Sequence, residues 1–126
     1  MSPESRVVAF APDLMDRSKV LAAARAAGAT VEVVTTPSAL PAAIDDGVSL
    51  ALVDLSRLDD LDVLSVCRGI PTVGFGSHVD RQLLRAAAEA GCSEVLPRSA
   101  FFKQLPSLVN RAVAPGPPAG GRERER

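Results

Sequence analysis

Five short apolar runs alternate with longer stretches of mixed polarity along this chain. The runs cover residues 6–10, 30–34, 49–54, 72–75 and 94–96. The segment Leu50-Ala51-Leu52-Val53 has no polar alternation, which is typical of a strand buried on both faces of a parallel sheet. The pattern therefore predicts five strands.

The stretches between these runs carry helix signals. Apolar periodicity and terminal glycines predict helices over 13–27, 38–46, 58–67, 77–90 and 103–113. Ser38 is the expected cap of the second helix, and Ser77 with Asp80 resembles a capping box for the fourth. Pro106 fits only the opening turn of a helix, so we expect the last helix to begin near Lys103.

The alternation of strands and helices predicts the fold class. Short connections between alternating strands and helices are typical of an α/β, doubly wound, five-stranded parallel sheet with helices on both faces. We expect the strand order 2-1-3-4-5. The domain should cover 6–113, after a flexible N-terminus at 1–5. Residues 114–126 are rich in Pro and Gly and then alternate Arg with Glu, so we expect a disordered tail.

Composition excludes several classes of protein. A net charge of −1, no Trp or Tyr and four Phe offer little for nucleic-acid binding. No apolar run approaches the roughly 18 residues of a membrane span, and residues 1–5 lack a signal-peptide pattern. We therefore expect a cytoplasmic protein that binds neither nucleic acid nor membrane. Cys67 and Cys92 lack metal or redox spacing and are expected to be buried thiols.

Asp54 is the principal candidate functional residue. It ends the third apolar run, and parallel sheets hold their chemistry just beyond the carboxyl ends of their strands. One interpretation makes Asp54 a phosphoacceptor. The other makes it a structural acid that caps the following helix or pairs with Arg98.

Three segments carry the pattern of a known family. They are Leu52-Val53-Asp54, the run from Ala86 to Arg98 around the fifth strand, and the turn at Gly28. On these segments the chain resembles the receiver domain of bacterial response regulators, a flavodoxin-like fold, over about residues 6–113. The resemblance implies an aspartate that accepts a phosphoryl group with the help of a magnesium ion, held by an acidic pair after the first strand.

The chain departs from that family pattern where the acidic pair should be. Alignment from Gly28 assigns the pair to Ala11 and Pro12, and neither side chain can ligate a metal. Asp13, one position later, could supply a single carboxylate, whereas magnesium prefers octahedral oxygen ligation with more than one fixed anchor. We therefore expect no cofactor and no metal, with magnesium required only if the chain is a working receiver.

Two further positions also differ from the family. The switch hydroxyl that ends the fourth strand falls on Gly76, with Ser77 adjacent, and the lysine after the fifth strand is replaced by Arg98. A planar guanidinium does not replace a flexible ammonium atom for atom. The degenerate pocket predicted from the sequence thus comprises Ala11, Pro12, Asp13, Gly76, Ser77 and Arg98.

The resemblance also implies a surface for partner contact, formed by the helix before the fifth strand, that strand and the last helix. At least one of Phe101 and Phe102 should pack on the sheet, and the other could join Leu105 and Leu108 in an exposed apolar patch. Another protein, of unknown identity, is the expected partner, and a homodimer is possible.

These observations lead to one functional hypothesis and two alternatives. The hypothesis is a non-catalytic pseudo-receiver, a protein–protein interaction module in signalling or regulation, and not an enzyme. The first alternative is a functional single-domain receiver phosphorylated at Asp54. The second is a structural component of a larger assembly.

Overall fold

The computed structural model describes residues 6–113, and the terminal segments predicted to be flexible lie outside the described residues. Parallel strands β1 (Arg6–Phe10), β2 (Thr30–Val34), β3 (Val48–Asp54), β4 (Thr72–Gly76) and β5 (Glu94–Pro97) form one sheet. Its order is β2-β1-β3-β4-β5, as expected from the sequence. The doubly wound five-stranded fold is therefore confirmed.

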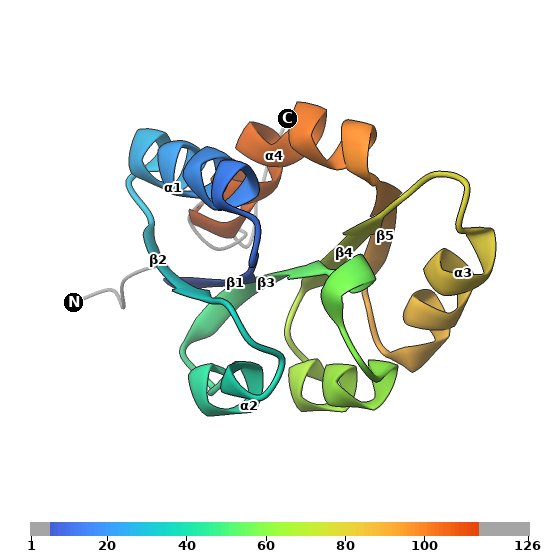
Figure 1. Ribbon diagram of the computed structural model, residues 1–126. Helices are drawn as coiled ribbons and strands as arrows, with labels where there is room; N and C mark the ends of the chain where they lie inside the picture. The colour runs from blue at the N-terminus through green and yellow to red at the C-terminus, as the bar shows by residue number, and fades with distance from the viewer. Residues whose placement is uncertain (1–5, 114–126) are drawn as a thin grey trace, which may run out of the picture.

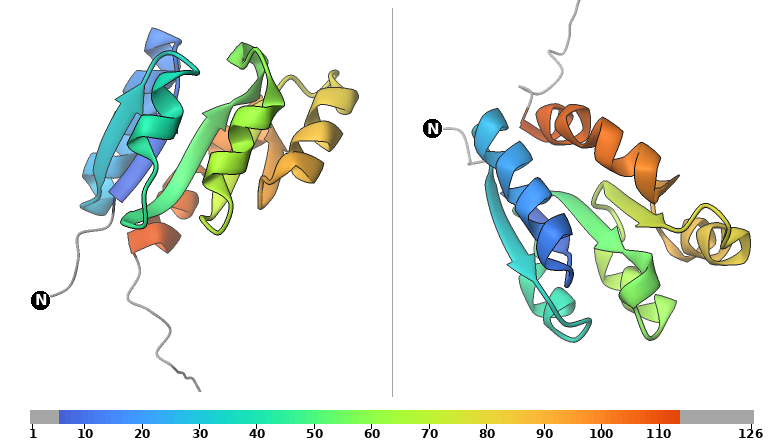
Figure 2. Two further views of the ribbon diagram at one scale, coloured as in Figure 1. Left: turned by 90° about the horizontal axis from the view of Figure 1, so that it is seen from below. Right: turned by 45° about the horizontal axis from the view of Figure 1, so that its top comes forward.

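Helices cover both faces of the sheet (Figure 1). On one face lie α1 (Leu14–Ala27) and α4 (Arg98–Val113), and on the other α2 (Ala39–Ala43), the 3₁₀ segment η2 (Leu61–Cys67) and α3 (Arg81–Ala90). Figure 2 shows α2, η2 and α3 side by side across the second face. None of the helices in the described range is long and apolar enough to cross a membrane.

The core is divided between these two faces by strand alternation. In β1, Val7 and Ala9 face α1 and α4, while Val8 and Phe10 face the other layer. All four side chains are fully buried. This two-sided burial explains why the strands read as nearly continuous apolar runs.

The second helix is shorter than predicted. It ends at Ala43, and Ile44 is already extended. The reason is Arg6 at the start of β1, whose guanidinium donates to the Ala43 carbonyl at 2.9 Å and to Asp45 Oδ1 at 2.8 Å. Asp45 Oδ1 also accepts from the Gly47 N–H, so a turn replaces the last helical residues.

The predicted helix at 58–67 is wrong in type. The chain forms two 3₁₀ segments, η1 (Leu55–Arg57) and η2, separated by residues 58–60, of which Leu58 and Asp60 are extended. A 3₁₀ helix rises about 2.0 Å per residue against about 1.5 Å for an α-helix. The short connection between β3 and β4 therefore spans more of the sheet than an α-helix of the same length would.

The predicted caps and start of the later helices also need correction. Asp80, not Ser77, caps α3 and accepts from the Leu83 N–H at 3.2 Å. The last helix begins at Arg98, directly after β5, and contains Pro106 in its interior. Pro106 is exposed, so water can reach the helix surface where the backbone N–H is missing.

Candidate functional site

The strand order brings the predicted site residues to one edge of the sheet. Ala11 and Pro12 follow β1, Asp54 ends β3, Gly76 ends β4 and Arg98 follows β5. Parallel strands end at the same edge, where open α/β sheets generally hold their ligand sites. This edge is the candidate functional site.

Asp54 is buried at this edge, with 1% of its surface exposed. Alternation along β3 places it on the same face as Leu50 and Leu52, beneath α1 and α4. Its Oδ1 accepts from the Ser56 N–H at 3.1 Å and so caps η1, whereas the segment near the helix predicted at 58–67, η2, is capped by Asp60. Burial raises the pKa of Asp54, and the Ser56 hydrogen bond and the Arg98 charge oppose that rise.

Arg98 forms an ion pair with Asp16, not with Asp54. The distance from Arg98 Nη2 to Asp16 Oδ1 is 2.5 Å, and the Asp16 side chain is 2% exposed while that of Arg98 is 43% exposed. This bond raises the pKa of Arg98. Asp16 Oδ2 has no hydrogen-bond partner within residues 6–113, so the carboxylate depends on Arg98.

Aromatic rings fix the Arg98 guanidinium from a second side. Its central carbon lies 5.5 Å from the Phe75 ring centroid and 5.3 Å from that of Phe102. Phe75 in turn stacks on Phe101, with centroids 4.1 Å apart. Cation–π contacts and the ion pair together hold Arg98 across the site.

Asp13 is also occupied by a structural contact. Its Oδ1 accepts from the Asp16 N–H at 3.0 Å and caps α1, and this hydrogen bond lowers the pKa of Asp13. Pro12 contributes its carbonyl to Arg17 Nη2 at 3.1 Å. Ala11 is buried and donates its N–H to the Val34 carbonyl.

These contacts decide whether the residues suit a magnesium ion. Asp13 and Asp54 each cap a helical segment through one oxygen, and Asp16 is neutralised by Arg98. Within the described chain, no three Asp, Glu, His or Cys side chains are grouped to hold a metal ion. The donor set at this edge therefore does not fit the octahedral oxygen ligation of magnesium.

The end of β4 carries no hydroxyl. Gly76 is its last residue, and a Cβ there would lie 3.4 Å from the nearest atom, a methyl of Leu84, so the space could accommodate a small side chain. Ser77 lies beyond the strand, where its Oγ accepts from the Val79 N–H at 3.4 Å. The Ser77 side chain therefore stabilises the turn that follows β4.

The exposed apolar patch considered for the last helix does not form. Phe101, Leu105 and Leu108 are at most 2% exposed and belong to the core beneath α1 and α4. Phe102 is half-buried against Arg98 and Lys19. The apolar stripe of α4 therefore packs on the sheet, and no exposed patch remains at Phe101, Leu105 and Leu108.

Asp16 is the site residue that sequence reasoning missed. It shares the buried face of α1 with Val20 and Ala24, at a spacing of four residues. An acid on an otherwise apolar helical stripe was the available signal, because such a charge needs a buried partner. Its partner lies 82 positions further along the chain, beyond the reach of local pattern analysis.

Solved structures similar to this chain include receiver domains. A response regulator from Hahella chejuensis superposes with a TM-score of 0.75 at 15% identity, over 88% of this chain and 96% of that chain. The receiver domain of NtrX from Brucella abortus gives 0.69 at 19% identity, over 86% and 98%. The chain spans 27% of the longer NtrX structure from the same organism, with a TM-score of 0.72 at 18% identity over 87% of this chain.

Another similar structure holds the metal that this site does not suit. It is the receiver domain of the sensor histidine kinase PA1611 from Pseudomonas aeruginosa, with magnesium in its active-site cleft, at a TM-score of 0.69 and 14% identity over 87% of this chain and 98% of that chain. No family model and no curated protein sequence matches the chain. The receiver-domain fold is thus established by structure.

Proposed function

We propose that this chain is a pseudo-receiver, a non-catalytic module that works in signalling or regulation by binding another protein. The observation that carries the proposal is the ion pair between Arg98 and the buried Asp16. It occupies the edge of the sheet where a receiver would hold its metal and phosphoryl group.

The charge arrangement supports this proposal. A phosphoryl group and its acceptor carboxylate repel each other unless a cation offsets their charge. Ala11 and Pro12 offer no side-chain ligands, and Arg98, whose charge favours ionised Asp54, is already paired with Asp16. Transfer to Asp54 would have to break that pair or proceed without Arg98 as a neutralising cation.

The burial and the raised pKa of Asp54 also support the pseudo-receiver proposal. Burial disfavours the ionised carboxylate and raises its pKa, and Oδ1 already accepts from Ser56. A nucleophilic carboxylate must be ionised and open to the donor, whereas this one is 1% exposed.

Intact-mass spectrometry after incubation with acetyl phosphate and magnesium tests the proposal. We expect no phosphoryl adduct on the wild-type chain. The Asp54→Asn variant is the matched control, because it keeps the shape of the side chain and cannot accept phosphate. An adduct on the wild type that the variant lacks would refute the pseudo-receiver function.

That refuting outcome defines the second candidate, a working single-domain receiver. Its supporting observation is the placement of Asp54 at the end of β3, at the edge shared with Arg98. The available oxygen ligands disfavour a working receiver, because Asp13 and Asp54 would each have to give up the hydrogen bond that caps a helical segment in order to bind magnesium.

The proposed partner surface comprises α3, β5 and α4. Because β5 is an edge strand, one of its two edges has no neighbour within the described sheet. Exposed Arg81, Arg85 and Glu89 on α3 give this surface a polar character in place of the expected apolar patch. We propose another protein or a second copy of the chain as the occupant, in the cytoplasm.

A further inference from the structure

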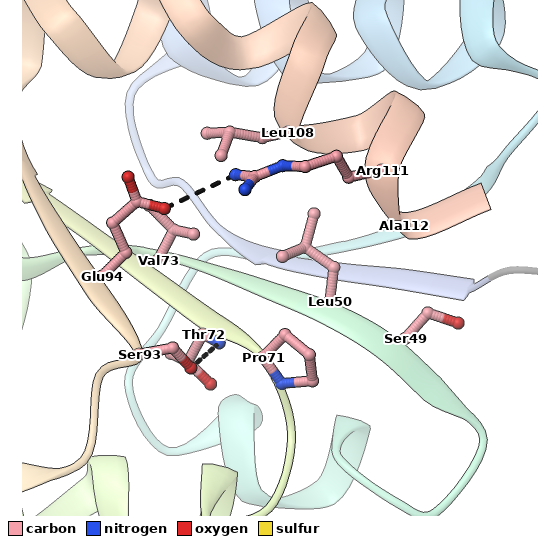
Figure 3. A pocket seen from close by; sticks show the side chains of 10 residues that line it. All are labelled: Ser49, Leu50, Pro71, Thr72, Val73, Ser93, Glu94, Leu108, Arg111 and Ala112. Carbon is pink, nitrogen blue, oxygen red and sulfur yellow. Dashed lines mark hydrogen bonds and ion pairs between the residues drawn. The ribbon is translucent and has the colours of Figure 1, made fainter. Parts of the chain in front are cut away.

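A pocket of about 310 Å³ lies at the opposite edge of the sheet from Asp54. It is lined by the first residues of β3, β4 and β5, by Pro71 before β4 and Ser93 before β5, and by the last turns of α4 (Figure 3). Small side chains at Ser49, Ser93 and Ala112 leave this space open. The proposed function makes no use of it.

The lining combines an apolar floor with a charged rim. Pro71 and Ala112 supply apolar surface, together with the small exposed parts of Leu50, Val73 and Leu108, which are at most 4% exposed. At the rim, Arg111 Nη2 and Glu94 Oε1 lie 3.5 Å apart, and Figure 3 shows the Arg111 side chain reaching across toward Glu94. Opposite charges therefore stand next to one another above an apolar recess.

The charged pair is free to exchange partners. The side chain of Arg111 is 68% exposed and that of Glu94 is 38% exposed. Exposed ion pairs of this length contribute little to stability, because water screens them and two long side chains must be ordered. A ligand that offers each group a better partner can open the pair at little cost.

We propose that this pocket binds a free α-amino acid with an apolar side chain. The ligand carboxylate pairs with the Arg111 guanidinium, whose planar donors match a carboxylate, and the ammonium group pairs with Glu94. The ligand side chain enters the recess that Pro71 and Ala112 line together with Leu50, Val73 and Leu108. The pocket volume falls at the low end of the range of about 300–1,000 Å³ typical of ligand sites, which suits a molecule of this size.

Ligands with a single charge match the pocket less well. A simple anion would engage Arg111 but leave Glu94 without a cation and the floor in contact with water. An apolar compound without charges would leave the rim unchanged. A zwitterion with an apolar substituent on the same carbon satisfies both rim groups and the floor.

A ¹H–¹⁵N NMR titration of the full chain with L-leucine tests the proposal. We expect saturable shifts at the amides of Leu50, Val73 and Glu94, with no change at Asp54. Isoamylamine lacks the carboxylate and 4-methylpentanoate lacks the ammonium group, and each should bind about tenfold more weakly or worse. Absence of saturation with leucine, or equal binding of either analogue, overturns the proposal.

Substitutions distinguish this pocket from other surfaces. Arg111→Gln and Glu94→Gln should each weaken leucine binding by about tenfold, the effect of losing one charge-assisted contact. Ala112→Leu should fill the pocket and abolish binding. The matched control Arg25→Gln, at an exposed position of α1 that does not line the pocket, should bind as the wild type does. Unchanged binding by Arg111→Gln, whose side chain is mostly exposed, overturns the assignment even if Ala112→Leu fails to fold.

Discussion

At the scale of single residues, the ion pair of Arg98 with Asp16 is the most consequential contact. The carboxylate of Asp16 is 2% exposed, and charges buried to that degree require a partner. Arg98 therefore supports the fold as well as occupying the edge of the sheet where receivers transfer phosphate. The two roles can be separated by substitution.

We predict that Arg98→Met lowers the free energy of unfolding by about 2 kcal/mol. Removing one partner of a fully buried pair costs about 3–5 kcal/mol, and the exposure of Arg98 reduces that figure. Urea denaturation measures the loss. Adding Asp16→Asn to the same chain should recover part of it, because the unpaired charge is then gone.

The control for this experiment is Arg111→Met, which breaks an ion pair whose arginine is 68% exposed. It should cost no more than about 0.5 kcal/mol. Equal losses for the two arginine variants would contradict the structural role of Arg98.

A second residue-scale prediction concerns the charge on Asp54. Its pKa in the folded chain is raised by burial above the unfolded value of about 3.9, so ionisation opposes folding. This destabilisation is absent at low pH, where the Asp54 carboxyl is protonated in both the folded and the unfolded chain. It reaches its full size above the pKa that Asp54 has in the folded chain. Asp54→Asn should therefore be more stable than the wild type at pH 7, with the difference closing as pH falls toward 4.

Thermal unfolding of both proteins across this pH range measures the difference. The side-chain amide of the Asp54→Asn variant would keep an oxygen acceptor for the Ser56 N–H, so the cap survives the change. A variant less stable than the wild type at neutral pH would show that the ionised carboxylate stabilises the fold.

A third prediction distinguishes the two glycines of β4. A Cβ on Gly74 would lie 2.9 Å from both terminal methyls of Leu55 and 3.0 Å from Cys92 Sγ, and both neighbours are buried. We expect Gly74→Ala to cost about 1–3 kcal/mol through overpacking. Gly76→Ala, with ordinary contacts at 3.4 Å or more, should stay within about 0.5 kcal/mol of the wild type. Urea denaturation measures both variants, and equal costs would contradict this packing.

At the scale of elements, the sequence predicts strands better than helix ends. Strand ends follow from apolar runs that must be buried on both faces, so they agree with the structure within one residue. The end of α2 depends instead on the Arg6 contact with Ala43, which joins residues 37 positions apart. Long-range contacts of this kind leave no local pattern.

The start of α4 shows a different limit of sequence reasoning. The penalty for an internal proline favours a helix that begins near Lys103, yet α4 begins at Arg98. The longer helix buries Phe101 in addition to Leu105 and Leu108, and Pro106 faces solvent. Burial of a large aromatic side chain is worth more than the single backbone hydrogen bond that is lost. The earlier start of α4 also affects the candidate site, because it places Arg98 in the first turn of the helix.

We predict that Pro106→Ala stabilises the protein by about 1–2 kcal/mol. An internal proline costs roughly 3 kcal/mol in a helix, offset by up to about 1 kcal/mol through its restriction of the unfolded chain. Alanine restores the N–H that the Phe102 carbonyl lacks. Differential scanning calorimetry measures the gain, with Ser107→Ala as the exposed neighbouring control. A loss of stability would mean that proline rigidity supports α4.

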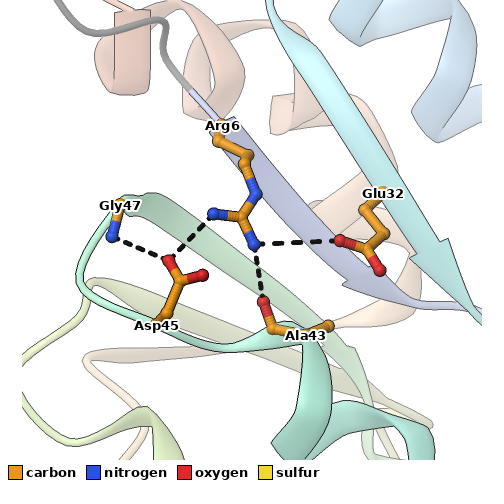
Figure 4. Close-up of polar contacts among 5 residues, drawn as sticks. All are labelled: Arg6, Glu32, Ala43, Asp45 and Gly47. Carbon is orange, nitrogen blue, oxygen red and sulfur yellow. Dashed lines mark hydrogen bonds and ion pairs between the residues drawn. The ribbon is translucent and has the colours of Figure 1, made fainter.

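At the scale of the whole molecule, an arginine stabilises each end of the sheet. Figure 4 shows Arg6 at the amino end, where it joins β1 to Glu32 in β2 and to Asp45 in the turn before β3. The contact raises the pKa of Arg6 and lowers that of Asp45. Arg98 joins α4 to α1 at the carboxyl end. Ion pairs between side chains therefore lie at both the amino and the carboxyl ends of the strands.

In the proposed pseudo-receiver, the Arg98–Asp16 ion pair takes the place of a phosphoryl site at the carboxyl end of the sheet. An NMR titration with magnesium and beryllofluoride, a mimic of the phosphoryl group, tests this most directly. We predict unchanged amide signals at Asp54, Gly76 and Arg98 in the wild type, as in the Asp54→Asn control. Saturable shifts at those residues that disappear in Asp54→Asn would contradict the claim and identify a working phosphoacceptor.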